Sequence, residues 1–97
     1  MSDRKTILLI DDDDSLRRVV EYNLREEGYD VVTASAGAEG LHLFQTRPID
    51  LVLTDVRMPE MDGVDVLARL KAIQSDLPVV MLTAHGTITS AVEAMKL

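Results

Sequence analysis

The chain has 97 residues, enough for a single domain with one modest hydrophobic core. Its seventeen acidic and ten basic side chains give a formal net charge of −7, which disfavours direct binding to nucleic acid because such binding needs a basic surface. The sequence contains no cysteine and no apolar run long enough to cross a membrane, which excludes a disulfide scaffold, thiol catalysis and a membrane span and indicates a small acidic domain of the cytoplasm.

Four short apolar runs are typical of buried β-strands. They cover residues 6–10, 31–34, 51–54 and 79–83. Three of these runs are nearly continuous in Ile, Leu and Val, which is the pattern of strands buried on both faces of a parallel sheet.

Stretches with helical spacing separate these runs, and a fourth stretch follows the last run. Their apolar positions lie within residues 16–24, 38–44, 66–73 and 88–95. The first predicted helix carries a Glu21/Arg25 pair and ends at Gly28. The second is weakened by Gly37 and Gly40, at roughly 1 kcal/mol each. Alternating strands and helices predict β-α-β units with right-handed crossovers, and therefore an α/β fold with a parallel sheet.

Aspartates stand where the predicted first and third helices begin. Asp13 and Asp14 precede the first helix, and Asp62 and Asp65 occupy the same place in the third. An aspartate at such a position caps free backbone N–H groups or stabilises the positive end of the helix dipole. We therefore interpret these four residues as caps or first-turn charges.

Acidic and hydroxyl side chains also follow three of the predicted strands. The first run ends in the four aspartates of residues 11–14, the third in Asp55 and the fourth in Thr83. Ligands of parallel α/β sheets bind outside the carboxyl ends of the strands. Carboxylates within about 5 Å repel one another by roughly 3 kcal/mol per pair at an effective dielectric constant of 20, so the cluster needs protons or a cation. Oxygen ligands with open positions favour Mg²⁺, and Mg²⁺ beside a free carboxylate suits phosphoryl transfer.

Three motifs in this order resemble the receiver domain of bacterial two-component response regulators. They are LLIDD (residues 8–12), LTDVRMP with MDG (53–59 and 61–63) and VMLTA (80–84). Residues 83–97 are most similar to the nitrogen-regulation activator class, in which the receiver precedes an AAA+ ATPase and a DNA-binding helix-turn-helix. The resemblance implies a flavodoxin-like, doubly wound parallel sheet with strand order 2-1-3-4. It also implies a signalling switch for transcription rather than an enzyme.

The resemblance also implies a role for each matching residue. Asp55 would accept a phosphoryl group from a phosphohistidine of a sensor histidine kinase. Mg²⁺ would be held directly by Asp12 and Asp55, through a water by Asp11, and by the backbone carbonyl of Arg57. Thr83 would form a hydrogen bond with the phosphoryl group and shift its loop between two states, as a charge-driven switch requires.

One part of the family pattern has no counterpart in this sequence. A complete receiver has a fifth strand ending in a lysine and then a fifth helix, whereas the lysines here are Lys5, Lys71 and Lys96. We therefore expect a single receiver domain over residues 1–97 that is truncated within its fourth helix, with its effector domain outside this chain. An uncovered sheet face and edge strand would favour a homodimer or another oligomer.

Two alternative functions remain open from the sequence. A Mg²⁺-dependent phosphatase of the haloacid dehalogenase type places a D-x-D motif after its first strand, which Asp11/Asp13 or Asp12/Asp14 would mimic together with Thr83. The third possibility is an interaction module that keeps the fold without phosphorylation.

Several polar residues of the first predicted helix have simpler interpretations. Arg17 and Arg18 are interpreted as solvated charges rather than phosphate ligands. Tyr22 and Tyr29 are interpreted as packing residues at the edges of this helix.

Overall fold

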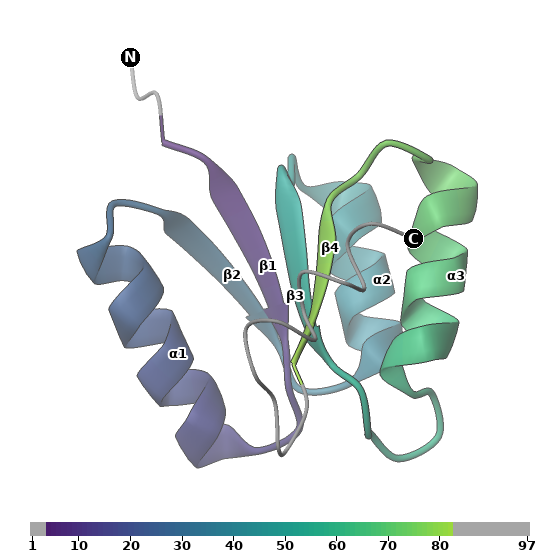
Figure 1. The fold of residues 1–97 in the computed structure, drawn as a ribbon, viewed down its shortest axis with the longest axis horizontal. Coiled ribbons are helices and arrows are strands. Elements are labelled where there is room, and N and C mark those ends of the chain that lie inside the picture. The colour runs from purple at the N-terminus through teal and green to yellow at the C-terminus, as the bar shows by residue number, and fades with distance from the viewer. Residues whose placement is uncertain (1–3, 83–97) are drawn as a thin grey trace.

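A parallel sheet with helices on both faces forms the structure, a computed structural model that describes residues 4–82 (Figure 1). In chain order the elements are β1 (Thr6–Ile10), α1 (Asp14–Glu26), β2 (Asp30–Ala34), α2 (Gly37–Thr46), β3 (Leu51–Asp55), α3 (Gly63–Ile73) and β4 (Val79–Leu82). The strands lie in the order β2-β1-β3-β4. The predicted α/β fold and strand order are confirmed. Thr83 and the expected fourth helix lie outside the described residues.

The central strand β1 is buried on both faces, as its apolar run predicted. Leu8, Leu9 and Ile10 are fully buried, and β1 forms parallel ladders with β2 on one side and β3 on the other. Figure 1 shows α1 on one face of the sheet and α2 with α3 on the opposite face. The larger core lies between the sheet and α2 and α3. It includes Ile10, Val52, Val66 and Leu70.

Strands β3 and β4 differ from the prediction of burial on both faces. Burial alternates along them, so that Val52 and Val79 are buried whereas Leu53 and Val80 are only half-buried. The physical reason is the place of α1, which packs against β1 and β2. Among the described residues, no helix covers β3 and β4 on that face.

Helix α1 is more exposed than its apolar spacing predicted. None of its residues is buried, and Leu16 and Val19 keep 43% and 57% of their surface exposed. The interpretation of Tyr22 and Tyr29 as packing residues is wrong, because both are exposed, Tyr22 at 63%. Within residues 4–82, helix α1 contacts mainly β1 and β2 of the sheet, and the apolar residues on its other side stay open to solvent.

The glycines of α2 have a structural role that propensity alone does not reveal. A Cβ atom on Gly40 would collide with the side chain of Ile10, and one on Gly37 would lie 2.9 Å from Cγ2 of Val66. The two positions therefore let α2 approach β1 and α3 closely. The loss of intrinsic helix stability is offset by this packing. Within residues 4–82, no helix is long and apolar enough to span a membrane.

Candidate functional site

The parallel pairing of β1 and β3 places two aspartates side by side at the carboxyl edge of the sheet. Ile10 of β1 lies opposite Thr54 of β3, so Asp11 and Asp55 follow at the same level. Asp12 comes next in the loop after β1. One carboxylate oxygen from each of Asp11, Asp12 and Asp55 lies within 4.8 Å of the other two. The structure thus brings together the three carboxylates that the sequence analysis singled out for a metal.

Asp11 is the buried member of this cluster. Its residue surface is 0% exposed, and its Oδ1 accepts a hydrogen bond of 2.9 Å from the backbone N–H of Asp13. Its Oδ2 is also buried and has no hydrogen-bond partner among the described residues. A buried carboxylate oxygen without a donor is costly unless a proton or a cation is present. This orphaned oxygen is the strongest structural indication of a cation at the site.

Asp55 is half-buried at the end of β3. Its Oδ1 accepts a hydrogen bond of 3.3 Å from the N–H of Arg57. The hydroxyl of the buried Thr54 donates to the Asp55 carbonyl at 3.1 Å, which secures the backbone from which the Asp55 side chain extends. Asp55 therefore combines a fixed backbone with a carboxylate that solvent reaches.

Both Asp11 and Asp55 have a raised pKa. Burial is the main cause for Asp11, and the charges of Asp12 and Asp13 add to it, whereas the Asp13 N–H and Arg17 lower this pKa. Burial is also the main cause for Asp55, helped by the negative charges of Asp11 and Asp12. The N–H groups of Arg57 and Val56 oppose the shift of Asp55 without cancelling it. The neighbouring N–H groups and Arg17 therefore do not fully offset the cost of burying and crowding these carboxylates.

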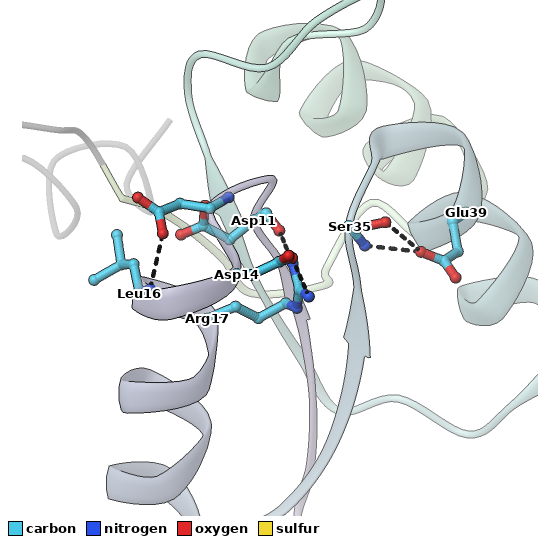
Figure 2. A network of polar contacts seen from close by, with 7 residues as sticks. Asp11, Asp14, Leu16, Arg17, Ser35 and Glu39 are labelled. Carbon is cyan, nitrogen blue, oxygen red and sulfur yellow. Dashed lines mark hydrogen bonds and ion pairs between the residues drawn. The ribbon is translucent and has the colours of Figure 1, made fainter.

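The remaining two aspartates of the run have other partners. Asp13 is the N-cap of α1, and its carboxylate accepts a hydrogen bond of 3.0 Å from the N–H of Leu16. Asp14 lies in the first turn and forms an ion pair of 2.6 Å with Arg17. Figure 2 shows these contacts at the start of α1. A phosphatase D-x-D motif would need Asp13 or Asp14 in the site, and this geometry gives both of them structural roles instead.

Arg17 corrects one interpretation made from the sequence. Its side chain is only 18% exposed and is not a solvated charge. Its Nη1 donates to the backbone carbonyl of Asp11 at 2.7 Å, while its Nη2 donates to Asp14 (Figure 2). The signal available in the sequence was the spacing of three residues between Asp14 and Arg17, which puts both on one side of a helix. Arg18, one residue further on, is exposed as expected.

The loop between β3 and α3 borders the site on its other side. It is closed by a hydrogen bond of 2.8 Å from the N–H of Gly63 to the carbonyl of Val56. A Cβ atom on Gly63 would collide with the carbonyl oxygen of Asp55. Asp62 caps α3 by accepting a hydrogen bond of 3.0 Å from the N–H of Asp65. Arg57 lies in this loop; the role predicted for its carbonyl stays a prediction, as does that of Thr83.

The loop after β2 ends at the same edge without adding a metal ligand. The carboxylate of Glu39 in the first turn of α2 accepts a hydrogen bond of 2.7 Å from the N–H of Ser35, which ties the loop after β2 to the helix (Figure 2).

Comparison with known proteins places these features in a family. Residues 7–97 match the response regulator receiver domain. Among curated proteins, the transcriptional regulatory protein GlrR of Escherichia coli K12 is 48% identical over 88 residues, which are 91% of this chain and 20% of that protein. The transcriptional regulatory protein ZraR of Escherichia coli O157:H7 is 43% identical over 97% of this chain and 21% of its own length. The chain thus spans about a fifth of these two relatives.

Solved structures give the same result for the fold. The response regulator TrrA of Thermotoga maritima, in complex with Mg²⁺ and BeF, superposes with a TM-score of 0.80 at 36% identity, covering 82% of this chain and 70% of that one. A second TrrA structure, in complex with the histidine kinase ThkA, has a TM-score of 0.80 and 35% identity over 86% of this chain and 72% of that one.

Proposed function

The chain belongs to the family of response regulator receiver domains, and on this premise we propose that Asp55 accepts a phosphoryl group and thereby switches an attached effector. The observation that carries the proposal is the buried Oδ2 of Asp11, which has no hydrogen-bond partner within residues 4–82 and lies in one cluster with Asp12 and Asp55. If hydrogen bonds within the protein alone balanced the charge of this cluster, each buried carboxylate oxygen would have a donor.

Mg²⁺ is the cation that suits this cluster best. The ligand atoms that Asp11, Asp12 and Asp55 offer are all carboxylate oxygens, which hard cations prefer. Three carboxylates leave coordination positions for water and phosphate. These residues, with the backbone carbonyl of Arg57, would hold the ion. When bound, Mg²⁺ offsets the repulsion between the carboxylates and the oxygens of the incoming phosphoryl group. The complex of the relative TrrA with Mg²⁺ and BeF supports this assignment.

Asp55 is the carboxylate placed for attack. It lies at the edge of the site, half-buried and reachable by solvent, whereas Asp11 is fully buried. One oxygen of Asp55 attacks the phosphorus of a phosphohistidine and forms a P–O bond. The P–N bond breaks, its electron pair stays on the imidazole nitrogen, and that nitrogen takes up a proton. The product is an aspartyl phosphate, to which Thr83 would donate a hydrogen bond.

The proposed partners are a sensor histidine kinase and a transcription effector. The complex of TrrA with the histidine kinase ThkA supports the first. The second is supported by GlrR and ZraR, which are transcriptional regulatory proteins about five times as long as the stretch this chain matches. The effector would belong to the nitrogen-regulation activator class, and the chain itself would make no direct contact with nucleic acid.

Self-association is a further part of the proposal. An apolar groove of about 500 Å³ runs beside α1 on the sheet face that α2 and α3 leave open. Its lining combines Tyr29 and the charged Lys5 and Asp50 with the aliphatic residues Ile7, Leu24, Leu51, Leu53 and Val80. Exposed apolar grooves of this kind favour contact with another apolar surface, and we propose that a second copy of the chain supplies it.

Phosphorylation from a small-molecule donor tests the proposed function. The chain is incubated with acetyl phosphate and Mg²⁺, and its intact mass is recorded beside that of Asp55→Asn, which keeps the shape of the side chain. We expect one added phosphoryl group on the wild type, none on the variant and none when EDTA removes the metal. An unmodified wild type that also binds no Mg²⁺ would favour a pure interaction module.

A further inference from the structure

We propose that Arg17 is a positioning residue of the cation site, which it organises by holding the backbone of Asp11 and the carboxylate of Asp14 at the same time. The inference rests on the proposed function, because it concerns the affinity of the same site for Mg²⁺. Arg17 itself contributes no oxygen ligand and does not touch the ion.

The two contacts of Arg17 span the loop that carries the ligands. Nη1 binds the carbonyl of Asp11 at 2.7 Å, and Nη2 binds Oδ1 of Asp14 at 2.6 Å. Asp11 leads out of β1 and Asp14 begins α1, so the guanidinium joins the end of the strand to the start of the helix. Asp12 lies between these two anchors. Its carboxylate can face Asp11 and Asp55 only while this short loop keeps its path.

The planar guanidinium is suited to this task. Its N–H groups form a rigid fork, so one side chain can satisfy a carbonyl and a carboxylate in fixed directions. The Arg17 side chain is 18% exposed, so water competes little with its bond to the Asp11 carbonyl, whereas Asp14 is 72% exposed and its ion pair with Arg17 is open to solvent. A lysine at the same position would carry the charge but could not reproduce the fork.

Arg17 also keeps Asp14 out of the cluster. Four consecutive carboxylates could rearrange around a cation in several ways, and Arg17 holds Asp14 in an ion pair while Asp13 caps α1. Asp11 and Asp12 are then the two residues left for the metal. Mutation of a residue that orients metal ligands without binding the metal typically weakens metal affinity by about 10-fold to 100-fold.

Charge and position predict opposite effects when Arg17 is replaced. A positive side chain near an acidic site repels a cation, so its removal should tighten binding if charge alone matters. If Arg17 fixes the loop, its removal should weaken binding instead. The loss should be larger for Mg²⁺, which demands near-octahedral geometry, than for Ca²⁺, which accepts irregular coordination.

Calorimetric titration of the full chain with each ion separates these possibilities. We expect Arg17→Ala to raise the Kd for Mg²⁺ about 10-fold and the Kd for Ca²⁺ by a clearly smaller factor. Arg18→Ala removes the same charge from an exposed neighbour and should leave the ratio of the two constants unchanged. Arg17→Lys should resemble Arg17→Ala in this ratio, because it keeps the charge without the fork.

The outcomes distinguish this inference from the proposed function. A wild type that binds no Mg²⁺ overturns both. Binding by the wild type with an equal or lower Kd in Arg17→Ala overturns the inference alone, and so does an equal loss for the two ions. If Arg17→Ala does not fold, Arg17→Lys decides by the same ratio. In the metal-free protein, amide exchange at Asp13, whose N–H is bound to Asp11, should quicken in the Arg17 variants and stay unchanged in Arg18→Ala.

Discussion

Asp11 shows how a single residue can lower the stability of a protein and serve its function. Its Oδ1 accepts a hydrogen bond from the N–H of Asp13, yet its Oδ2 is buried and no donor in the described part of the chain reaches it. Two further carboxylates lie within 4.8 Å. The fold of the described residues tolerates this arrangement because the sheet edge holds Asp11 by its backbone, through a hydrogen bond of 3.1 Å from its N–H to the carbonyl of Ala34. A cation relieves the cost, which couples stability to binding.

The raised pKa values of Asp11 and Asp55 predict how stability depends on pH without metal. Both groups hold protons in the folded state at pH values where the unfolded chain, with a pKa near 3.8, has released them. Their contribution to the free energy of unfolding is therefore complete below the unfolded pKa and is lost as the pH rises through the raised folded values. We expect urea unfolding in EDTA, followed by circular dichroism, to show this loss.

The matched variants make the pH prediction specific. Asp11→Asn removes the buried charge and keeps the acceptor for the Asp13 N–H, so it should raise the metal-free stability near neutral pH by about 1–3 kcal/mol, the scale of one partly screened charge pair. The exposed Asp76→Asn should change little. A wild type and Asp11→Asn with parallel pH profiles would show that the cluster carries no such repulsion.

Gly63 supports the site through close packing. A Cβ atom there would collide with the carbonyl oxygen of Asp55 and lie 2.9 Å from Cα of Val56. We expect Gly63→Ala to lower the free energy of unfolding by about 2–3 kcal/mol, as overpacking does. Gly28→Ala is the comparison, because its Cβ would meet nothing within 4 Å and only its φ of 97° opposes a side chain. Equal losses, of about 1 kcal/mol each, would contradict the steric argument.

At the scale of elements, helix caps set where α1 and α3 begin beside the site. Asp62 accepts a hydrogen bond from the N–H of Asp65 and thereby starts α3 directly after the loop from Asp55. We expect Asp62→Ala to lower the free energy of unfolding by about 1 kcal/mol in thermal or urea unfolding. Asp65→Ala removes an exposed first-turn charge and should lower the free energy of unfolding by only about 0.3 kcal/mol. A larger loss at Asp65 would contradict the assignment of the cap.

Strands and caps were predictable from the sequence because their signals are local. The apolar runs gave the four strands, and the aspartates at positions 13 and 62 were identified as caps and are so. The roles of Arg17 and Gly40 were not predictable in this way. Arg17 depends on the backbone carbonyl of Asp11 just after β1, and Gly40 on the side chain of Ile10. Ile10 meets Gly40 only in the folded sheet, and the Asp11 carbonyl faces Arg17 only once the loop between β1 and α1 has formed.

The burial of the strands was also predictable only in part. The apolar run of β1 correctly indicated a central strand, whereas the equally apolar β3 and β4 are half-exposed on one face. The composition of a strand shows that it can be buried. The connections between the strands decide which helix covers it. Helix α1 connects β1 to β2 and packs against these two strands rather than against β3.

At the scale of the whole molecule, the two sheet faces are covered unequally. In the described part of the chain, α2 and α3 close one face while α1 leaves the groove beside Leu53 open. We expect the wild type to associate reversibly in sedimentation velocity runs over increasing concentration, and Leu53→Lys to remain monomeric. Val64→Lys places the same charge on the exposed side of α3 and should associate like the wild type. A strictly monomeric wild type at high concentration would contradict the proposed dimer.

Chemical trapping identifies which carboxylate carries the phosphoryl group. The chain is phosphorylated with acetyl phosphate and Mg²⁺, reduced with borohydride to convert an aspartyl phosphate into homoserine, digested and sequenced by tandem mass spectrometry. We expect homoserine in place of Asp55 and at no other aspartate. Homoserine in place of Asp11 or Asp12 would contradict the assignment of Asp55 and would show that an aspartate after β1 is the nucleophile.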